Sequence, residues 1–283
     1  MKAYDYHYPK LSSIDLGFIR SPGPGLGNLL LPISRALIGS IRYQGIFIHP
    51  TIPQLKIGPI IRGETDKRVY WSILKARSVS QWKDFLRIWS VPNRCGEMHA
   101  YDVDSCLIPK TSRVIRYEGL KNYFHDLEGF EMEIYDWISK NTLPEAPQIS
   151  PPDVVVHIRQ GDFSEYNPHN VDTCYQTPFD WYAYAIKLAT KASTRSNDPV
   201  LLLTDGFHQD VARQIDLNNY VLPPSGYTAL QTILLGAKAK ILIASKSTFS
   251  MWMRFLGKSQ VYWEPEFDIS RYLKVTKRDL IIN

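Results

Sequence analysis

The second half of the chain alternates between short apolar runs and amphipathic stretches. The runs are rich in leucine and β-branched residues, which predicts buried strands at 154–156, 200–203, 220–222, 241–244 and 261–263. Between them, apolar side chains recur every three or four positions, which predicts helices. Their apolar faces are Phe179, Tyr182, Ile186 and Ala189; Phe207, Val211 and Ile215; Leu230, Ile233, Leu234 and Ala237; and Phe249, Trp252, Met253 and Leu256. This alternation predicts an open parallel sheet with helices on both faces.

The first half has a less regular pattern. An apolar stretch at 16–19 precedes a glycine loop at 21–27, and apolar residues then recur at helical spacing over 29–41. This order predicts a strand, a turn and a helix. Two further amphipathic helices are expected over 69–90 and 130–138.

A proline-rich segment at 142–152, TLPEAPQISPP, separates the two halves. Its prolines can continue neither a helix nor a central strand. We therefore expect domains at 1–146 and 147–283. The length of 283 residues fits two domains, and 44% hydrophobic with 22% charged residues is typical of a globular chain.

Charge and cysteine content narrow the function classes. The net charge of +5 suits an anionic ligand but is too small for a nucleic-acid-binding surface. The longest charge-free run, 217–237, contains prolines and polar residues, so no membrane span is expected, and the polar N-terminus is not a signal peptide. The cysteines at 95, 106 and 174 form no CxxC pair, which indicates free thiols and a cytoplasmic location.

Polar residues follow the predicted strand at 154–156, at the edge where parallel sheets bind ligands. His157 and Arg159 share one face by strand alternation, and Asp162 follows in the next turn. An arginine fork suits bidentate contact with phosphate. The alternative is an Arg159–Asp162 ion pair that closes the turn.

A second polar segment follows the strand at 241–244. Ser247 is placed to cap a helix that starts at Thr248, and free amides at such an end, including that of Phe249, bind anions. Lys246 adds positive charge. The alternative is a plain capped helix.

Asp205 follows the strand at 200–203. Its carboxylate either accepts hydrogen bonds from a base or ribose or caps the helix that starts near Phe207, and the cap is the preferred interpretation. No histidine, cysteine or acidic residues have metal-ligand spacing, and Asp102 and Asp104 lie in an unpatterned stretch, so no metal site is expected.

Five segments, in chain order, resemble the α-1,2-fucosyltransferase family and the wider GDP-fucose-dependent superfamily. They are GLGN at 25–28, YEGLKNYF at 117–124, HIRQGD at 157–162, LTD at 203–205 and ASKSTFS at 244–250, followed by Trp252. The chain departs from the family at Gln160, which replaces an arginine, at an insertion around 245–246, and at Gln231, which replaces an acidic residue.

The resemblance implies a GT-B architecture, with two Rossmann-like domains that face a central cleft. It also implies inverting transfer of L-fucose from GDP-β-L-fucose to a glycan hydroxyl, with no metal or other cofactor. The partners are then a nucleotide-sugar donor and a glycan acceptor. The departures leave open another nucleotide sugar as donor, and a non-catalytic nucleotide-sugar-binding homologue is a further alternative.

The resemblance also suggests roles for individual residues. Arg159 is expected at the β-phosphate together with the turn at Ser247, Thr248 and Phe249. Asp205, Gly27 and Asn28 are further candidates for the donor site. The general base is left open among His157, Asp162, Glu165 and His169, and the alternative is that the departing phosphate takes the proton of the acceptor hydroxyl. Trp71, Trp82 and Trp89 either line an acceptor groove or belong to the core of the first domain, and the core is the expected place.

Overall fold

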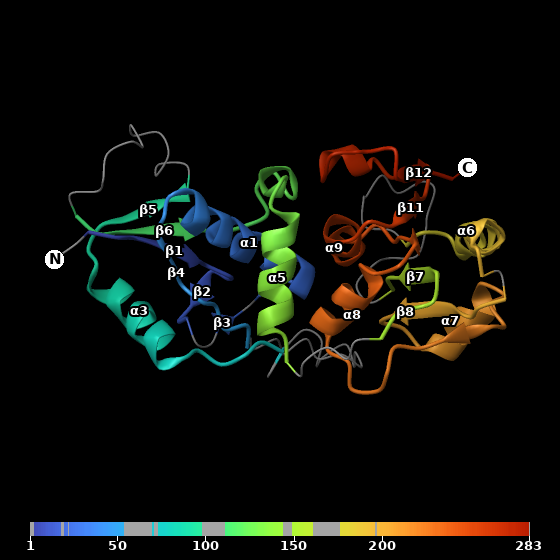
Figure 1. Ribbon diagram of the computed structural model, residues 1–283, viewed down its shortest axis with the longest axis horizontal. Helices are drawn as coiled ribbons and strands as arrows, with labels where there is room; N and C mark the ends of the chain where they lie inside the picture. Colours follow the sequence, from blue (N-terminus) through green and yellow to red (C-terminus); the bar gives the residue numbers. More distant parts are fainter. Residues whose placement is uncertain are drawn as a thin grey trace. The chain divides into compact units, whose positions relative to one another are not determined.

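The structure is a computed structural model that describes residues 3–17, 20–21, 23–53, 70, 73–97, 111–143, 149–160, 176–195 and 197–282. These residues form two compact units, one ending at Leu143 and the other starting, within the described ranges, at Ile149. Each unit is built on its own parallel sheet with flanking helices (Figure 1). The predicted α/β fold with two Rossmann-like units is confirmed.

The first unit has a four-stranded sheet in the order β4-β1-β6-β5, with every neighbouring pair parallel. The strands are β1 (Asp5–Pro9), β4 (Ile46–Phe47), β5 (Arg94–Gly96) and β6 (Arg113–Tyr117). A small antiparallel pair, β2 (Ile14–Asp15) with β3 (Arg20–Ser21), lies outside this sheet. The strand expected at 16–19 is wrong, because Leu16 and Gly17 lie between β2 and β3 in no strand.

Helices cover both faces of this first sheet. They are α1 (Leu26–Arg42), α3 (Val79–Ser90), α5 (Glu131–Asn141) and a short 3-10 helix, η1 (His125–Leu127). Ala36 of α1 packs against Ile115, whereas Phe85 of α3 packs against Val114 on the other side of the same strand.

The helix expected over 69–90 begins at Val79, because Ser78 and Gln81 form a capping box at that point. The interpretation of its tryptophans as core is wrong for Trp82 and Trp89, which are 39% and 56% exposed. Phe85 and Ile88 take the core positions instead. Trp71 lies outside the described residues.

The second unit has a six-stranded, fully parallel sheet in the order β12-β11-β10-β7-β8-β9. The strands are β7 (Val154–Ile158), β8 (Val200–Thr204), β9 (Tyr220–Val221), β10 (Ile241–Ile243), β11 (Gln260–Trp263) and β12 (Asp279–Ile281). This is the strand order of dinucleotide-binding sheets. The chain order reverses between β7 and β10. A further strand, β12, follows the last of the predicted strands, 261–263, and the apolar pattern did not indicate it.

The helices of the second unit lie between the strands as the periodicity predicts. They are α6 (Phe179–Ala192), α7 (His208–Gln214), α8 (Ala229–Gly236) and α9 (Thr248–Leu256), followed by the 3-10 helix η2 (Ile269–Arg271). Val154, Val156 and Ile158 pack with residues of α6 and α7, so His157 projects from the opposite face of β7. Phe207 is 71% exposed and does not belong to the buried face of α7.

Candidate functional site

A pocket of about 430 Å³ lies at the carboxyl ends of β7 and β8. Its wall includes His157 in β7, Arg159 directly after that strand, Asp205 after β8, and Phe249 in the first turn of α9. Open parallel sheets bind ligands where the strand order reverses, and here that point lies between β7 and β10. The pocket therefore has the position and size of a small-molecule site.

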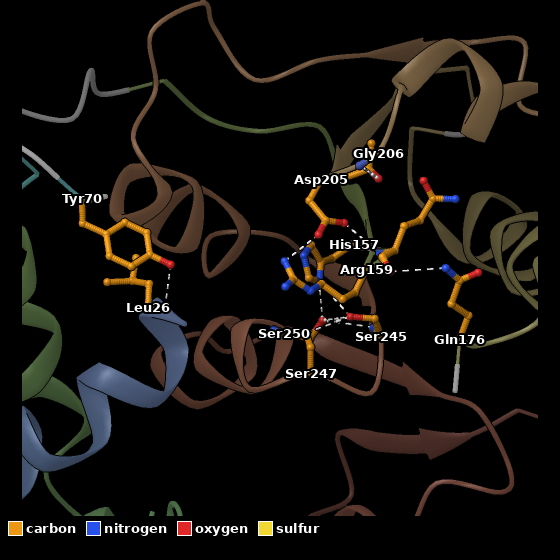
Figure 2. A network of polar contacts seen from close by, with 12 residues as sticks. Leu26, Tyr70, His157, Arg159, Gln176, Asp205, Gly206, Ser245, Ser247 and Ser250 are labelled. Carbon is orange, nitrogen blue, oxygen red and sulfur yellow. Dashed lines mark hydrogen bonds and ion pairs between the residues drawn. The ribbon is translucent and has the colours of Figure 1, made fainter. Parts of the chain in front are cut away.

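Arg159 is held at the pocket by Asp205 (Figure 2). Arg159 Nη1 and Asp205 Oδ2 are 2.6 Å apart, and the two side chains remain 22% and 18% exposed. Asp205 Oδ1 also accepts the backbone N–H of Gln160 at 2.7 Å. The predicted role of Asp205 as a helix cap is wrong, because the N-cap of α7 is Phe207 and no side chain caps that helix. Asp205 instead fixes the direction of an arginine that lines the pocket.

His157 is the centre of a buried polar cluster with three serines (Figure 2). Its Nδ1 lies 2.6 Å from Ser250 Oγ and 2.9 Å from Ser245 Oγ. Its ring stacks on Phe249, with 5.0 Å between ring centroids. Burial, followed by the nearby Arg159 charge, lowers the pKa of His157 to about 3. The imidazole is therefore neutral near pH 7.

The N-terminus of α9 is capped as predicted. Ser247 is the N-cap, and its Oγ accepts the N–H of Ser250 at 3.3 Å and contacts Ser245 Oγ at 2.9 Å. The backbone amides of Thr248 and Phe249 make no hydrogen bond to other residues that the structure describes. These two donors give α9 the positive end that binds anions.

Lys246 does not contribute a free charge to this site. Its ammonium forms an ion pair with Glu264, and both side chains are buried, with 4% and 6% exposed. Burial lowers the pKa of Lys246 and raises the pKa of Glu264. The expectation of added positive charge at position 246 is therefore wrong.

The wall of the pocket beside α8 contains a residue that no sequence signal indicated. Tyr227 lines the pocket, and its hydroxyl oxygen is buried with no hydrogen-bond partner among the residues that the structure describes. Gln231, one of the departures from the family pattern, turns away into a capping box, where its Oε1 accepts the N–H of Thr228 at 2.7 Å. Of these two side chains, Tyr227 is thus the one that can form a hydrogen bond with a ligand in the pocket.

The remaining candidate residues lie elsewhere. Gly27 and Asn28 lie in the first turn of α1, in the first unit, where Leu26 donates its N–H to the Tyr70 hydroxyl at 3.0 Å (Figure 2). Asn28 Oδ1 is buried, and no described residue forms a hydrogen bond with it.

Several candidates lie outside the described residues: Asp162, Glu165, His169, Asp102, Asp104, Cys106 and Cys174. Cys95 is a free thiol. Over the described ranges, no three histidine, cysteine or acidic side chains are grouped as metal ligands, and no helix has the length and apolarity to cross a membrane.

The sequence matches no protein-family model and no curated protein. In structure, the chain is similar to a NodZ alpha-1,6-fucosyltransferase soaked with GDP-fucose, with 13% identity, a TM-score of 0.44, and coverage of 95% of this chain and 97% of that one. It is also similar to a fucosyltransferase NodZ from Bradyrhizobium, with 11% identity, a TM-score of 0.44, and coverage of 91% and 94%. At such low similarity, function has to be inferred from the site itself.

Proposed function

We propose that this chain is a glycosyltransferase that binds a nucleoside-diphosphate sugar in the pocket of its second unit. The donor we propose is GDP-β-L-fucose, with transfer of L-fucose to a glycan hydroxyl and inversion at the anomeric carbon. The donor and an α-1,2 linkage follow from the motif resemblance, whereas the diphosphate site is supported by geometry.

One observation carries the proposal: an oriented arginine and the start of a helix meet at one pocket beside the reversal point of a Rossmann-type sheet. Arg159 is fixed by Asp205, and Phe249 of α9 lines the pocket. The amides of Thr248 and Phe249 have no hydrogen-bond partner among the described residues. A diphosphate is the ligand that uses both kinds of donor, because its oxygens accept bidentate arginine contacts and hydrogen bonds from amides.

The same groups serve the chemical step. The bond between the sugar C1 and the β-phosphate oxygen breaks, so negative charge grows on the leaving diphosphate. Arg159 and the α9 amides are already oriented toward that charge and stabilise it more strongly as it develops. They thereby take the role that a metal ion plays in other transferases.

His157 fits a positioning role better than that of general base. Its pKa of about 3 makes it a weak proton acceptor near neutral pH. Its contacts to Ser245 and Ser250 connect the end of β7 to the first turn of α9. It therefore fixes the position of the amides relative to Arg159. The proton of the acceptor hydroxyl passes instead to Asp162 or to the departing phosphate.

The test measures binding and turnover with purified full-length protein. GDP and GDP-fucose should bind in titration calorimetry, and UDP and UDP-glucose should not. Arg159→Ala should lower the rate of GDP release from GDP-fucose by ~10²–10³, and Arg159→Lys should also be poor, because a point charge does not replace the fork. Arg213→Ala is the matched control, because Arg213 is 81% exposed on α7 and pairs with the exposed Asp210.

Each other outcome contradicts a defined part of the proposal. Binding of UDP ligands alone would keep the diphosphate site and replace the donor. Binding of GDP-fucose without GDP release, with acceptor glycans present, would identify a non-catalytic homologue. Unchanged turnover in Arg159→Ala would refute the assigned site.

A further inference from the structure

Helix α3 of the first unit is labelled in Figure 1. Four of its large apolar side chains are exposed to solvent. They are Val79, Trp82, Leu86 and Trp89, with 75%, 39%, 61% and 56% of their surface exposed. At 3.6 residues per turn, they fall within about 80° of one another around the helix axis. They form one continuous apolar stripe, which we call the α3 stripe.

The α3 stripe is not part of the core of the first unit. Phe85 and Ile88 are 3% and 6% exposed, and they belong to the cluster that packs on the sheet. Helix α3 therefore has a second apolar surface, in contact with water, besides the one that faces the core. Contiguous exposed apolar surface of this kind marks an interaction site.

The two indoles of the α3 stripe are fixed in place. Trp82 and Trp89 each pack edge-to-face on Phe85, with 5.8 Å and 6.3 Å between ring centroids. The guanidinium of Arg77 lies 5.0 Å from the Trp82 ring, and that of Arg94 lies 5.9 Å from the Trp89 ring. Side chains already held in their bound orientation lose little entropy when they insert into a partner.

The charges beside the α3 stripe are mainly basic. Lys83, Arg87 and Arg94 are exposed, and the acidic residue of the helix, Asp84, lies 3.4 Å from Arg87. Three basic groups and one acidic group leave a local excess of positive charge. Around the helix axis, Lys83 and Arg87 lie next to the stripe, on the side away from Phe85.

This combination identifies the partner by its chemistry. Tryptophan rings prefer the interface between lipid headgroups and acyl chains, and long basic side chains beside them reach anionic headgroups. A second copy of the chain fits less well, because a symmetric contact would set the same basic edge against itself. We propose that the α3 stripe binds the surface of a bilayer containing anionic phospholipids, with α3 lying flat on it. This surface belongs to the first unit, so it is independent of the donor pocket.

The experiment is co-sedimentation of the purified full-length chain with vesicles. One set is phosphatidylcholine, and the other contains about 30% phosphatidylglycerol as the anionic lipid. The chain should sediment with the anionic vesicles and be released by high salt, since salt screens the basic groups. Leu86→Asp should weaken the partition by about tenfold or more, because it puts a charge in the apolar stripe.

The variants separate lipid binding from other effects. Met132→Asp is the matched control, because Met132 is an isolated apolar residue, 79% exposed on α5, and this variant should bind like the wild type. The pair Lys83→Gln and Arg87→Gln should weaken binding to anionic vesicles. Circular dichroism should show that every variant is folded.

Three results would overturn the proposal. The first is wild-type protein that stays in the supernatant with both kinds of vesicle. The second is an equal loss of binding in Met132→Asp. The third is a dimer in analytical ultracentrifugation that Leu86→Asp dissociates, which would identify a second copy as the occupant.

Discussion

His157 and Arg159 come from one strand end, yet their surroundings give them opposite properties. Arg159 keeps 22% of its side chain exposed and is aimed by Asp205. His157 is 5% exposed, and its neutral ring is fixed among hydroxyl groups. The exposed cation can therefore contact a ligand, while the buried ring holds two elements together. At the scale of single residues, burial decides which of the two acts on the ligand.

His157 makes stability depend on pH. Its pKa of about 3 in the folded chain lies well below the ordinary histidine value of 6.5. Between these values the unfolded chain binds a proton that the folded chain does not. The free energy of unfolding therefore falls as pH decreases from 6.5 toward 3, by up to about 1.4 kcal/mol per pH unit, and gains no such contribution above 6.5.

Urea unfolding at pH values from about 7.5 to 5 measures this slope. His7, whose pKa burial lowers to about 4, adds to it. His157→Gln should reduce the slope relative to that of the wild type. An unchanged slope in His157→Gln would contradict the neutral, buried state of this ring.

Tyr227→Phe should change stability and binding in opposite directions. The hydroxyl is buried with no hydrogen-bond partner among the described residues, so its removal should stabilise the free protein by about 1 kcal/mol. If the hydroxyl binds the nucleotide, the affinity for GDP should fall about fivefold to tenfold. Thermal unfolding and calorimetry measure the two effects. Tyr184→Phe, at a 46% exposed position on α6, should change neither.

At the scale of elements, the site depends on how α9 starts. Ser247 fixes the residue at which the helix begins, and the amides of Thr248 and Phe249 in that first turn have no hydrogen-bond partner among the described residues. The hydroxyls of Ser245 and Ser250 connect that turn to His157 at the end of β7. The buried pair of Lys246 with Glu264 connects the same loop to the residue after β11. Three strands of the sheet therefore fix one helix terminus.

Two substitutions of Ser247 distinguish its role as a helix cap from anion binding at the start of α9. Asn and Asp cap helices about equally well and have nearly the same volume. Ser247→Asn and Ser247→Asp should therefore unfold at similar temperatures. Ser247→Asp should lower the affinity for GDP far more than Ser247→Asn does, because the aspartate charge repels a diphosphate at the helix terminus. Equal affinities for GDP in the two variants would place the diphosphate elsewhere.

At the scale of the whole molecule, the two units divide the proposed tasks. The second unit has the strand order and the pocket of a nucleotide-binding sheet. The first unit has its own parallel sheet, and it contains the α3 stripe and the buried Asn28 Oδ1. Donor binding and membrane binding can thus be tested separately in one chain.

Hydrogen exchange of the whole chain tests this division. GDP should protect peptides over 154–160, 201–209 and 244–252, because a bound ligand suppresses local opening. GDP-fucose should protect the same peptides. Peptides over 79–90 should not change with either ligand. Protection confined to the first unit would contradict the assigned pocket.

The sequence predicted much of the second unit because its signals are local. A parallel strand buried on both faces needs a continuous apolar run, as at 154–156, and a helix cap needs a short polar side chain, as at Ser247. It did not reveal β1, because Asp5 and His7 occupy that strand. Their partners are Arg113 and Tyr117, more than a hundred residues away in the chain.

The sequence by itself thus determined the alternation of strands and helices in the second unit and the helix terminus at Ser247. Tertiary structure alone decided that Arg159 pairs with Asp205, that Lys246 is neutralised by Glu264, and that the Tyr227 hydroxyl is buried at the pocket. It also decided that the core uses Phe85 and leaves the tryptophans of α3 in water. Periodicity and capping depend on neighbours along the chain, whereas partners and exposure depend on which distant segments the fold brings together.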